Sequence, residues 1–192
     1  MTKAILIING HPDASSARLC AALTAAYERG AQGAGHVVRR LDIGLIDIPL
    51  MASRDEYEST DLAPQIALAQ RDVAWADHVV IIFPLWLGTM PAKLKALLEQ
   101  VLRKDFAFGP KGFGEARLKG KSARVVVTMG MPAIIYRLVF AAHGVLGLEQ
   151  GILKMVGFSP VRHNLLGDVE TRDVSRREHW LRLLEQEGAK GQ

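Results

Sequence analysis

Short apolar runs alternate along the chain with stretches of helical periodicity. Residues 3–9 and 77–83 are continuous runs rich in β-branched side chains, which predict strands buried on both faces of a sheet. Three further strands are predicted at residues 36–41, 124–129 and 161–166. Charge enters the strand at residues 36–41 through Arg39 and Arg40, which favours an edge position.

The segments between these strands are predicted to be helical. Pro84 stops one strand, and Pro91 begins the next helix, where its missing N–H costs nothing. The first predicted helix begins with serine at Ser16, which is suited to an N-cap. The helices are expected at residues 16–32, at 62–75, from Pro91 onward, from the fourth strand to about 156, and at 173–187.

This alternation predicts an α/β fold with helices on both faces of a parallel sheet. Five strands are compatible with the doubly wound order 2-1-3-4-5. A chain of 192 residues suits one domain, so we expect residues 1–192 to fold as a single unit. In that order the ligand crevice lies between strands one and three, outside their carboxyl ends. The connections at those ends are therefore the place to look for function.

Composition narrows the classes of function. Hydrophobic residues make up 49% of the chain, and the net charge of +4 is thinly spread, which fits an anionic cofactor and argues against a nucleic-acid surface. Cys20 is the single cysteine and lies in an apolar helix, so we expect a buried thiol, a reducing compartment and a cytoplasmic protein. We expect no membrane span, no signal peptide and no metal site.

The connection after the first strand carries chemistry for an anion. It reads from Asn9 through His11 and Asp13 to Ser16, Ala17 and Arg18, so hydroxyls and side-chain donors gather at a helix start. An ordinary turn capped by Asp13 and the serines accounts for the same residues equally well. A G-x-G-x-x-G fingerprint is absent, and Gly120-Lys121-Ser122 only imitates the end of a P-loop because it precedes a strand.

The connection after the third strand is apolar where a soluble sheet usually turns polar. It contains Pro84, Leu85, Trp86, Leu87 and Gly88 and ends at Pro91. Apolar side chains at the mouth of a sheet need a partner, and a flat aromatic ring edged by backbone groups meets that need. Packing against a neighbouring helix or subunit is the alternative. The prolines and Gly88 imply a fixed loop shape, which favours a ligand.

The connection after the fourth strand holds Thr128, Met129, Gly130 and Met131, and Tyr136 and His143 follow on what is predicted to be one helix. Their separation is two helical turns, so both side chains are expected on about the same face. Taken singly, each is more often an ordinary core or surface residue.

Together these connections resemble the flavodoxin-like NAD(P)H:quinone oxidoreductases, the family of the mammalian quinone reductases and the bacterial modulator-of-drug-activity proteins. The resemblance runs from residue 3 to about 162. It is carried by Gly10-His11-Pro12-Asp13, residues 83–95, Phe106-Ala107-Phe108-Gly109 and residues 128–136. It implies a flavodoxin-like doubly wound fold and a flavin, FAD with FMN possible, reduced by NAD(P)H.

The resemblance also implies roles for individual residues. His11, Ser16, Ala17 and Arg18 match positions that hold the flavin phosphates. The residues from Pro84 to Gly88 match the loop bordering the isoalloxazine ring, and those from Thr128 to Met131 match the loop on its pyrimidine side. Tyr136 matches the tyrosine near the N1 and O2 edge of the flavin, and His143 lies one residue off its partner's usual spacing. Phe106 and Phe108 match aromatics that line the acceptor pocket, supplied in the family by the second subunit of a homodimer.

The implied function is a two-electron, ping-pong reduction of a quinone-like acceptor. The protein would position the cofactor and stabilise negative charge at the N1 and O2 edge through Tyr136, His143 and backbone N–H groups. Ala17-Arg18 replaces the commoner Phe-Asn pair of the family, which leaves FAD against FMN open. A flavin-binding regulatory or ancillary protein with little turnover is the alternative, and a non-flavin interaction module on the same scaffold is a third.

Overall fold

The computed structural model describes residues 1–110, 112–170 and 173–192. Five parallel strands form one sheet in the order β2-β1-β3-β6-β7, which is the predicted order 2-1-3-4-5. The strands are β1 (Ala4–Asn9), β2 (Val37–Asp42), β3 (His78–Pro84), β6 (Ser122–Thr128) and β7 (Val161–Leu166). The predicted fold is confirmed, and β2 lies at the edge as expected.

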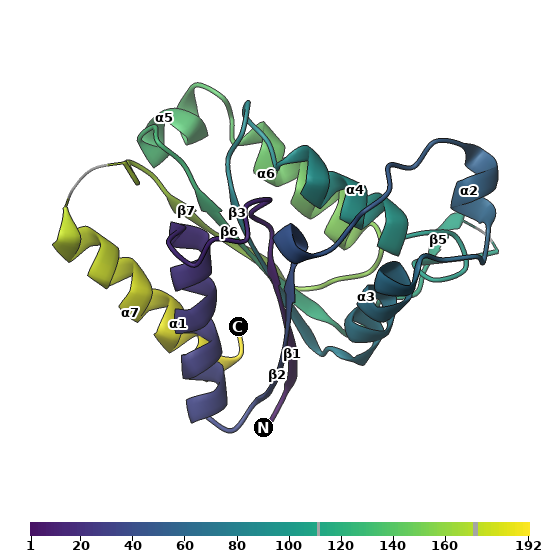
Figure 1. Cartoon of the computed structure of the whole chain (residues 1–192), viewed down its shortest axis with the longest axis horizontal. Helices are drawn as coiled ribbons and strands as arrows, with labels where there is room; N and C mark the ends of the chain where they lie inside the picture. Colours follow the sequence, from purple (N-terminus) through teal and green to yellow (C-terminus); the bar gives the residue numbers. More distant parts are fainter. Residues whose placement is uncertain (111, 171–172) are drawn as a thin grey trace.

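Helices cover both faces of the sheet (Figure 1). Helices α1 (Leu19–Gly33) and α7 (Val174–Lys190) lie on one face. The opposite face carries α3 (Pro64–Trp75), α4 (Ala92–Val101) and α6 (His143–Leu148), which continues as the π-helix η2 (Glu149–Lys154). The shorter elements are η1 (Ile43–Leu45), α2 (Arg54–Glu58), α5 (Ala133–Leu138), and the strands β4 (Phe108–Gly109) and β5 (Gly112–Ala116).

The central position of β3 in the sheet explains why its sequence is continuously apolar. Val79, Ile81 and Phe83 point into the core beneath α3 and α4. Val80 and Ile82 point into the core beneath α1 and α7. A central strand alternates its side chains between two buried faces, so neither set can be polar.

Helices α1 and α7 approach each other closely through two glycines. A Cβ atom on Gly30 would lie 1.9 Å from the carbonyl oxygen of Glu185, and one on Gly188 would lie 2.1 Å from that of Tyr27. Larger residues would therefore force the two helices apart. This pairing holds α1, and with it the connection that leads into α1, in a fixed position.

Two helix predictions are wrong in detail. Helix α1 begins at Leu19, and its N-cap Arg18 makes no side-chain capping bond. A serine instead acts within the preceding turn, where the Ser15 hydroxyl accepts from the Ala17 N–H. The single helix predicted after the fourth strand is broken, because Ala141 and Ala142 adopt left-handed backbone angles between α5 and α6.

Candidate functional site

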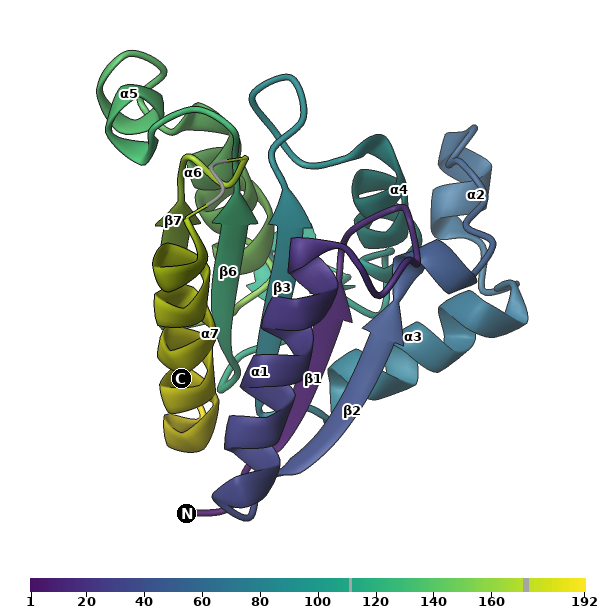
Figure 2. The same cartoon turned by 60° about the vertical axis from the view of Figure 1, so that its left-hand side comes forward.

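The three connections singled out in the sequence meet at the carboxyl end of the sheet (Figure 2). Strands β1, β3 and β6 are direct neighbours, so the segments that leave them are adjacent. The Gly10 N–H donates to the Ile82 carbonyl at 2.7 Å, and the Leu85 N–H donates to the Thr128 carbonyl at 2.8 Å. These bonds tie each connection to the neighbouring strand, and they set the floor of a common site.

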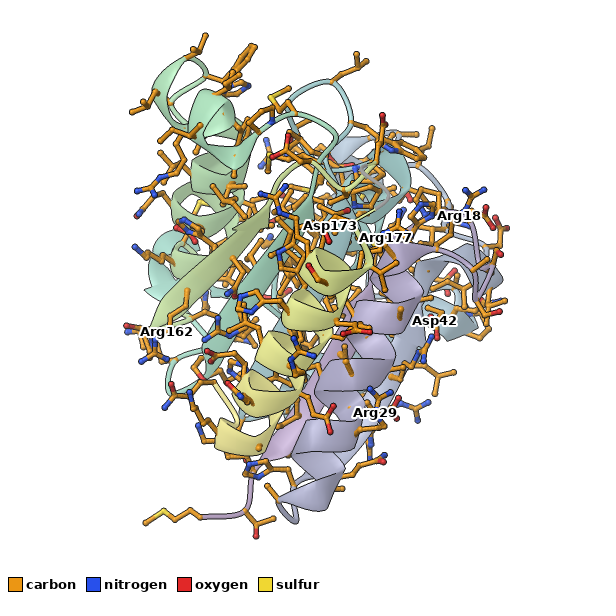
Figure 3. The ribbon with its side chains drawn as sticks, turned by 90° about the vertical axis from the view of Figure 1, so that its left-hand side faces the viewer. Arg18, Arg29, Asp42, Arg162, Asp173 and Arg177 are labelled. Atoms are coloured by element: carbon orange, nitrogen blue, oxygen red, sulfur yellow. The ribbon has the colours of Figure 1, made fainter. Side chains whose placement is uncertain are left out.

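The connection from Gly10 to Arg18 is organised by its own side chains. Asp13 pairs with Arg18 at 2.6 Å, and the Asp13 N–H donates to Nδ1 of His11 at 3.0 Å. Burial, and next the Arg18 charge, lower the pKa of His11, so its imidazole is neutral. The local turn proposed as an alternative is therefore present. The amino end of α1 still offers N–H groups that no side chain caps, and Arg18 lies beside it (Figure 3).

The connection after β3 makes a tight turn. The Trp86 N–H donates to the Thr89 carbonyl at 2.9 Å, and the Thr89 N–H returns a bond of 3.1 Å to Trp86. Leu87 and Gly88 both have positive φ, 48° and 82°. Leu87 is fully exposed and Trp86 is half exposed, with the His11 ring edge-on to the indole at 6.0 Å. An apolar residue held exposed in a left-handed conformation is typical of a binding loop.

Tyr136 supports this turn from below. Its side chain is fully buried, and its hydroxyl donates to the Gly88 carbonyl at 3.0 Å and accepts from the Val145 N–H at 3.3 Å. Burial raises the pKa of the phenol. A Cβ atom on Gly144 would lie 2.1 Å from the Gly88 carbonyl oxygen, so only glycine fits there. The turn therefore rests on the amino end of α6.

The prediction that Tyr136 and His143 share one helix is wrong, since Tyr136 lies in α5 and His143 begins α6. Their rings are nevertheless adjacent, with centroids 6.4 Å apart. Nδ1 of His143 bonds the Phe140 carbonyl at 2.8 Å, so Nδ1 carries the hydrogen in the neutral ring. The other ring nitrogen, Nε2, faces the turn near Gly88.

The connection after β6 is fixed to the segment that follows β7. The Met129 N–H donates to the Leu166 carbonyl at 2.9 Å, and the Asp168 N–H donates to the Met131 carbonyl at 3.1 Å. Gly130 is exposed between them. Beneath this connection the Thr128 hydroxyl contacts Sγ of Cys20 at 3.5 Å. Burial raises the pKa of the Cys20 thiol to about 11, and the predicted buried thiol is confirmed.

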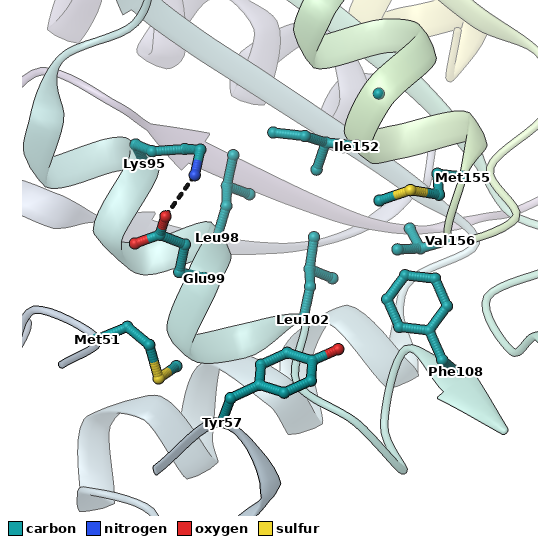
Figure 4. A pocket seen from close by; sticks show the side chains of 11 residues that line it. Met51, Tyr57, Lys95, Leu98, Glu99, Leu102, Phe108, Ile152, Met155 and Val156 are labelled. Carbon is teal, nitrogen blue, oxygen red and sulfur yellow. Dashed lines mark hydrogen bonds and ion pairs between the residues drawn. The ribbon is translucent and has the colours of Figure 1, made fainter. Parts of the chain in front are cut away.

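One cavity adjoins the turn, and a second cavity adjoins the first. The first, of about 760 Å³, is lined by Trp86, Leu87, Pro91, His143 and Gly147 among others. The second, of about 580 Å³, continues between α4 and η2 and shares Lys95 and Ile152 with the first. Figure 4 shows Phe108 on one side of this second cavity.

Phe106 and Phe108 do not line one cavity within this chain. Phe106 lies against α3, in a hollow with Pro64, Leu68 and Arg71. Phe106 lies in a turn that follows Asp105, whose φ is 66°, whereas Phe108 begins β4, so the turn directs the two side chains to different places. Sequence reasoning missed Met51, Tyr57, Lys95 and Ile152 as cavity residues, because no local pattern distinguishes them.

These features define a doubly wound α/β protein with a crevice at the carboxyl ends of its strands. The chain belongs to the family described as flavodoxin-like fold, whose model matches residues 3–186.

Three known proteins are similar to it. A ribosyldihydronicotinamide dehydrogenase-like protein of Penicillium crustosum is 31% identical over 60% of this chain and 43% of its own length. An uncharacterized NAD(P)H oxidoreductase of Haemophilus influenzae is 27% identical over 94% of this chain and 92% of its own. The solved structure of an NAD(P)H:quinone oxidoreductase from Methanothermobacter marburgensis matches with a TM-score of 0.85 at 22% identity, covering 99% of this chain and 97% of that chain.

The length of the match differs between these relatives. This chain spans less than half of the Penicillium protein and 37% of the human ribosyldihydronicotinamide dehydrogenase that it also matches. Within the described part of the chain, every helix is too short or too polar to cross a membrane. The same residues bring together no group of three or more His, Cys, Asp or Glu side chains able to hold a metal ion.

Proposed function

We propose that this protein is a flavin-dependent oxidoreductase that takes a hydride from NAD(P)H and reduces a quinone-like acceptor by two electrons. The observation that carries the proposal is the turn from Trp86 to Thr89, left-handed and apolar, fixed by Tyr136 and Gly144 beside a cavity of about 760 Å³. The names of the similar proteins support the same chemistry.

The described residues fit a flavin. The uncapped amino end of α1, with His11, Ser16, Ala17 and Arg18 around it, suits the phosphate. The segment from Pro84 to Gly88 offers an apolar edge to the ring, and the turn from Thr128 to Met131, which is exposed at Gly130, would face its polar side. FAD is the expected form and FMN the alternative.

The structure changes the role we propose for Tyr136. Its hydroxyl is occupied by the Gly88 carbonyl and the Val145 N–H, so it acts by holding the turn. His143 has a ring nitrogen that faces the turn, and it is the better candidate to hold a proton beside the acceptor.

The overall reaction consumes NAD(P)H, one proton and a quinone, and yields NAD(P)⁺ and a hydroquinone. A bound flavin would supply the two-electron carrier between donor and acceptor, which gives ping-pong kinetics. The protein would supply the positions of both planar molecules and exclude water through Trp86 and Leu87.

We also propose a homodimer. The surface beside the turn exposes large apolar side chains on and after α5, namely Ile134, Ile135, Leu138, Val139 and Phe140, next to Leu87. Monomers rarely expose such patches, and a second copy would cover it. The single domain of residues 1–192 and the cytoplasmic location remain predictions.

Purified protein tests the proposal directly. We expect a yellow protein that oxidises NAD(P)H when a simple quinone is added and forms one hydroquinone per NAD(P)H. Mass spectrometry of the released cofactor distinguishes FAD from FMN. Bound flavin without turnover would favour the ancillary flavin-binding role. A protein that takes up neither FAD nor FMN would exclude both the oxidoreductase function and the ancillary flavin-binding role.

The phosphate site has its own test. Arg18→Glu places a negative charge beside the α1 amino end, so it is expected to weaken FMN or FAD by about tenfold or more and riboflavin much less. Arg29→Glu is the matched control, because Arg29 lies on the same helix but pairs with Glu185 near the far end (Figure 3). Equal losses for riboflavin and the phosphorylated flavins would contradict the phosphate contact.

A further inference from the structure

The second cavity has no occupant in the proposed reaction as described so far. At about 760 Å³ the first cavity already has the size of a site for a whole small ligand. The second adds about 580 Å³ lined by Leu98, Leu102, Phe108, Met155 and Val156. Most of its lining is apolar, and its two charged lining residues, Lys95 and Glu99, pair with each other, so the cavity suits an apolar group.

One wall of the second cavity comes from the segment around α2. Met51 and Tyr57 face α4 and η2 across the cavity (Figure 4). Helix α2 has five residues, and none of them is buried. A helix of this length does not hold its position by itself, so the wall depends on contacts with the rest of the protein.

Those contacts are polar and converge on Arg103, just beyond the end of α4. The Arg103 side chain is 4% exposed, and one guanidinium nitrogen donates to the carbonyls of Glu56 at 2.9 Å and Asp61 at 3.2 Å. Its other terminal nitrogen donates to Gln100 and lies 3.6 Å from the Glu56 carboxylate.

Gln100 and Glu56 complete the network. Gln100 is fully buried, and its amide donates to Glu56 at 2.8 Å and to the Pro49 carbonyl at 3.1 Å. The Glu56 carboxylate also accepts from the Ala52 N–H at 2.8 Å. These bonds hold both ends of the segment that carries Met51 and Tyr57.

We propose that the second cavity receives an apolar substituent of the quinone acceptor, and that Arg103 is the positioning residue that fixes the Met51 and Tyr57 wall. The quinone head occupies the first cavity, and its alkyl or isoprenoid tail runs past Lys95 and Ile152 into the second. This inference rests on the proposed function, and it names a tailed quinone as the substrate class.

Two glycines one turn apart provide a matched test. A Cβ atom on Gly151 or on Gly147 would meet nothing within 4 Å, so a larger side chain is accommodated at either position. Gly151 lines the second cavity, whereas Gly147 lines the first. Gly151→Leu is expected to lower kcat/KM for a decyl-substituted benzoquinone by about tenfold and to leave unsubstituted benzoquinone unchanged. Gly147→Leu is expected to lower both.

Arg103→Met tests the positioning role. We expect KM for the decyl-substituted quinone to rise about tenfold, with kcat and the KM for benzoquinone nearly unchanged. Arg103→Lys is expected to recover part of the loss, because one donor to the carbonyls remains. Arg54→Met is the control, since Arg54 lies in α2, the helix that carries Tyr57, is exposed and pairs with Glu58.

Calorimetry with the decyl-substituted quinone and the purified holoprotein supplies a readout apart from turnover. Weaker binding to Gly151→Leu, with benzoquinone binding intact, supports the proposal. Equal binding of the tailed quinone to Gly151→Leu and the unaltered protein would overturn it, whether or not Arg103→Met folds. A second copy of the chain that covers the cavity would also overturn it. In that case Gly151→Leu would weaken the binding of both quinones and would also dissociate the dimer. Absence of NAD(P)H oxidation in the unaltered protein is a separate failure, that of the proposed function.

Discussion

The two ends of the parallel strands, here called the amino-terminal edge and the carboxyl-terminal edge of the sheet, differ in which side chains they bury. At the amino-terminal edge, charged and polar side chains are buried and bonded to one another. At the carboxyl-terminal edge, apolar side chains are exposed and the backbone enters left-handed conformations.

The amino-terminal edge closes on the end of the chain. Arg124 donates to Glu187 at 2.8 Å and also to Asn164 and the Gln192 carbonyl. His78 bonds the Ser122 hydroxyl at 2.8 Å. Arg124 and the Ser122 hydroxyl have partners within the fold, while Nε2 of His78 is buried without one among the described residues, so this edge contributes stability and exposes few groups to a ligand.

The carboxyl-terminal edge instead exposes apolar side chains and backbone N–H groups. Trp86 and Leu87 are held in water by a strained turn, and the first N–H groups of α1 are uncapped. Strain of this kind persists where the surrounding structure enforces it, and it is concentrated at functional sites. The contacts that stabilise the fold and the groups proposed to bind a ligand therefore lie at opposite ends of the strands, and substitutions at each edge test this separation.

The largest effect is expected at the amino-terminal edge. Arg124→Met leaves the Glu187 carboxylate without its buried partner and is expected to lower the free energy of unfolding by about 3–5 kcal/mol. Urea unfolding measures it. The control Arg162→Met removes an exposed arginine from the neighbouring strand (Figure 3) and is expected to change stability by less than about 0.5 kcal/mol. If folded Arg124→Met protein lost flavin binding, the proposed separation between the stabilising edge and the ligand-binding edge would be wrong.

We expect a fall in pH to lower the free energy of unfolding through His78. Burial, and then Lys3, Arg124 and Arg162, lower the pKa of His78 to about 3, whereas the unfolded chain binds this proton near 6.5. The unfolded state therefore binds more protons between these values, and stability falls as the pH falls. Between pH 7 and pH 5 the loss from this group is about 2 kcal/mol.

His78→Gln removes this titration, so its unfolding free energy is expected to depend less on pH than that of the unaltered protein. The pKa of His11 at the other edge is also lowered, so its smaller contribution remains in both proteins. Parallel pH profiles for the two proteins would contradict the assignment to His78.

At the carboxyl-terminal edge, Gly144→Ala is expected to displace the turn. The new methyl group would overlap the Gly88 carbonyl and cost about 1–3 kcal/mol, and we expect it to appear as weaker flavin binding. Gly147→Ala, in the same helix and facing open space, is the control. Flavin titration of both variants measures the difference, and equal affinities would show that the turn does not border the flavin.

The smallest effect is expected from removing one hydroxyl. Tyr136→Phe takes the donor from the Gly88 carbonyl, which costs about 1 kcal/mol and should slow flavin reduction several-fold while flavin affinity stays nearly intact. Tyr27→Phe is the matched control at the other edge, where the hydroxyl bonds Gln192. Stopped-flow reduction rates that are equal in the two variants would remove Tyr136 from the site.

Much of the fold followed from local pattern. The strand at residues 161–166 was predicted to the residue, and the other strands to within two residues, because buried strands need unbroken apolar or alternating runs. The three candidate connections could be singled out because a doubly wound sheet places them at one edge. The break at Ala141 and Ala142 was missed, since neither residue favours a left-handed backbone.

Periodicity along the chain was enough to predict which segments are buried. The number and alternation of those segments were compatible with the order 2-1-3-4-5, and that order placed the candidate connections at one edge. Other features depend on how the folded elements pack. Tyr136 and Gly144 hold the Gly88 turn, and Arg103 supports a cavity wall. Phe106 and Phe108 line different cavities. These contacts join residues far apart in sequence. They arise from how packed elements meet, and no short pattern records that.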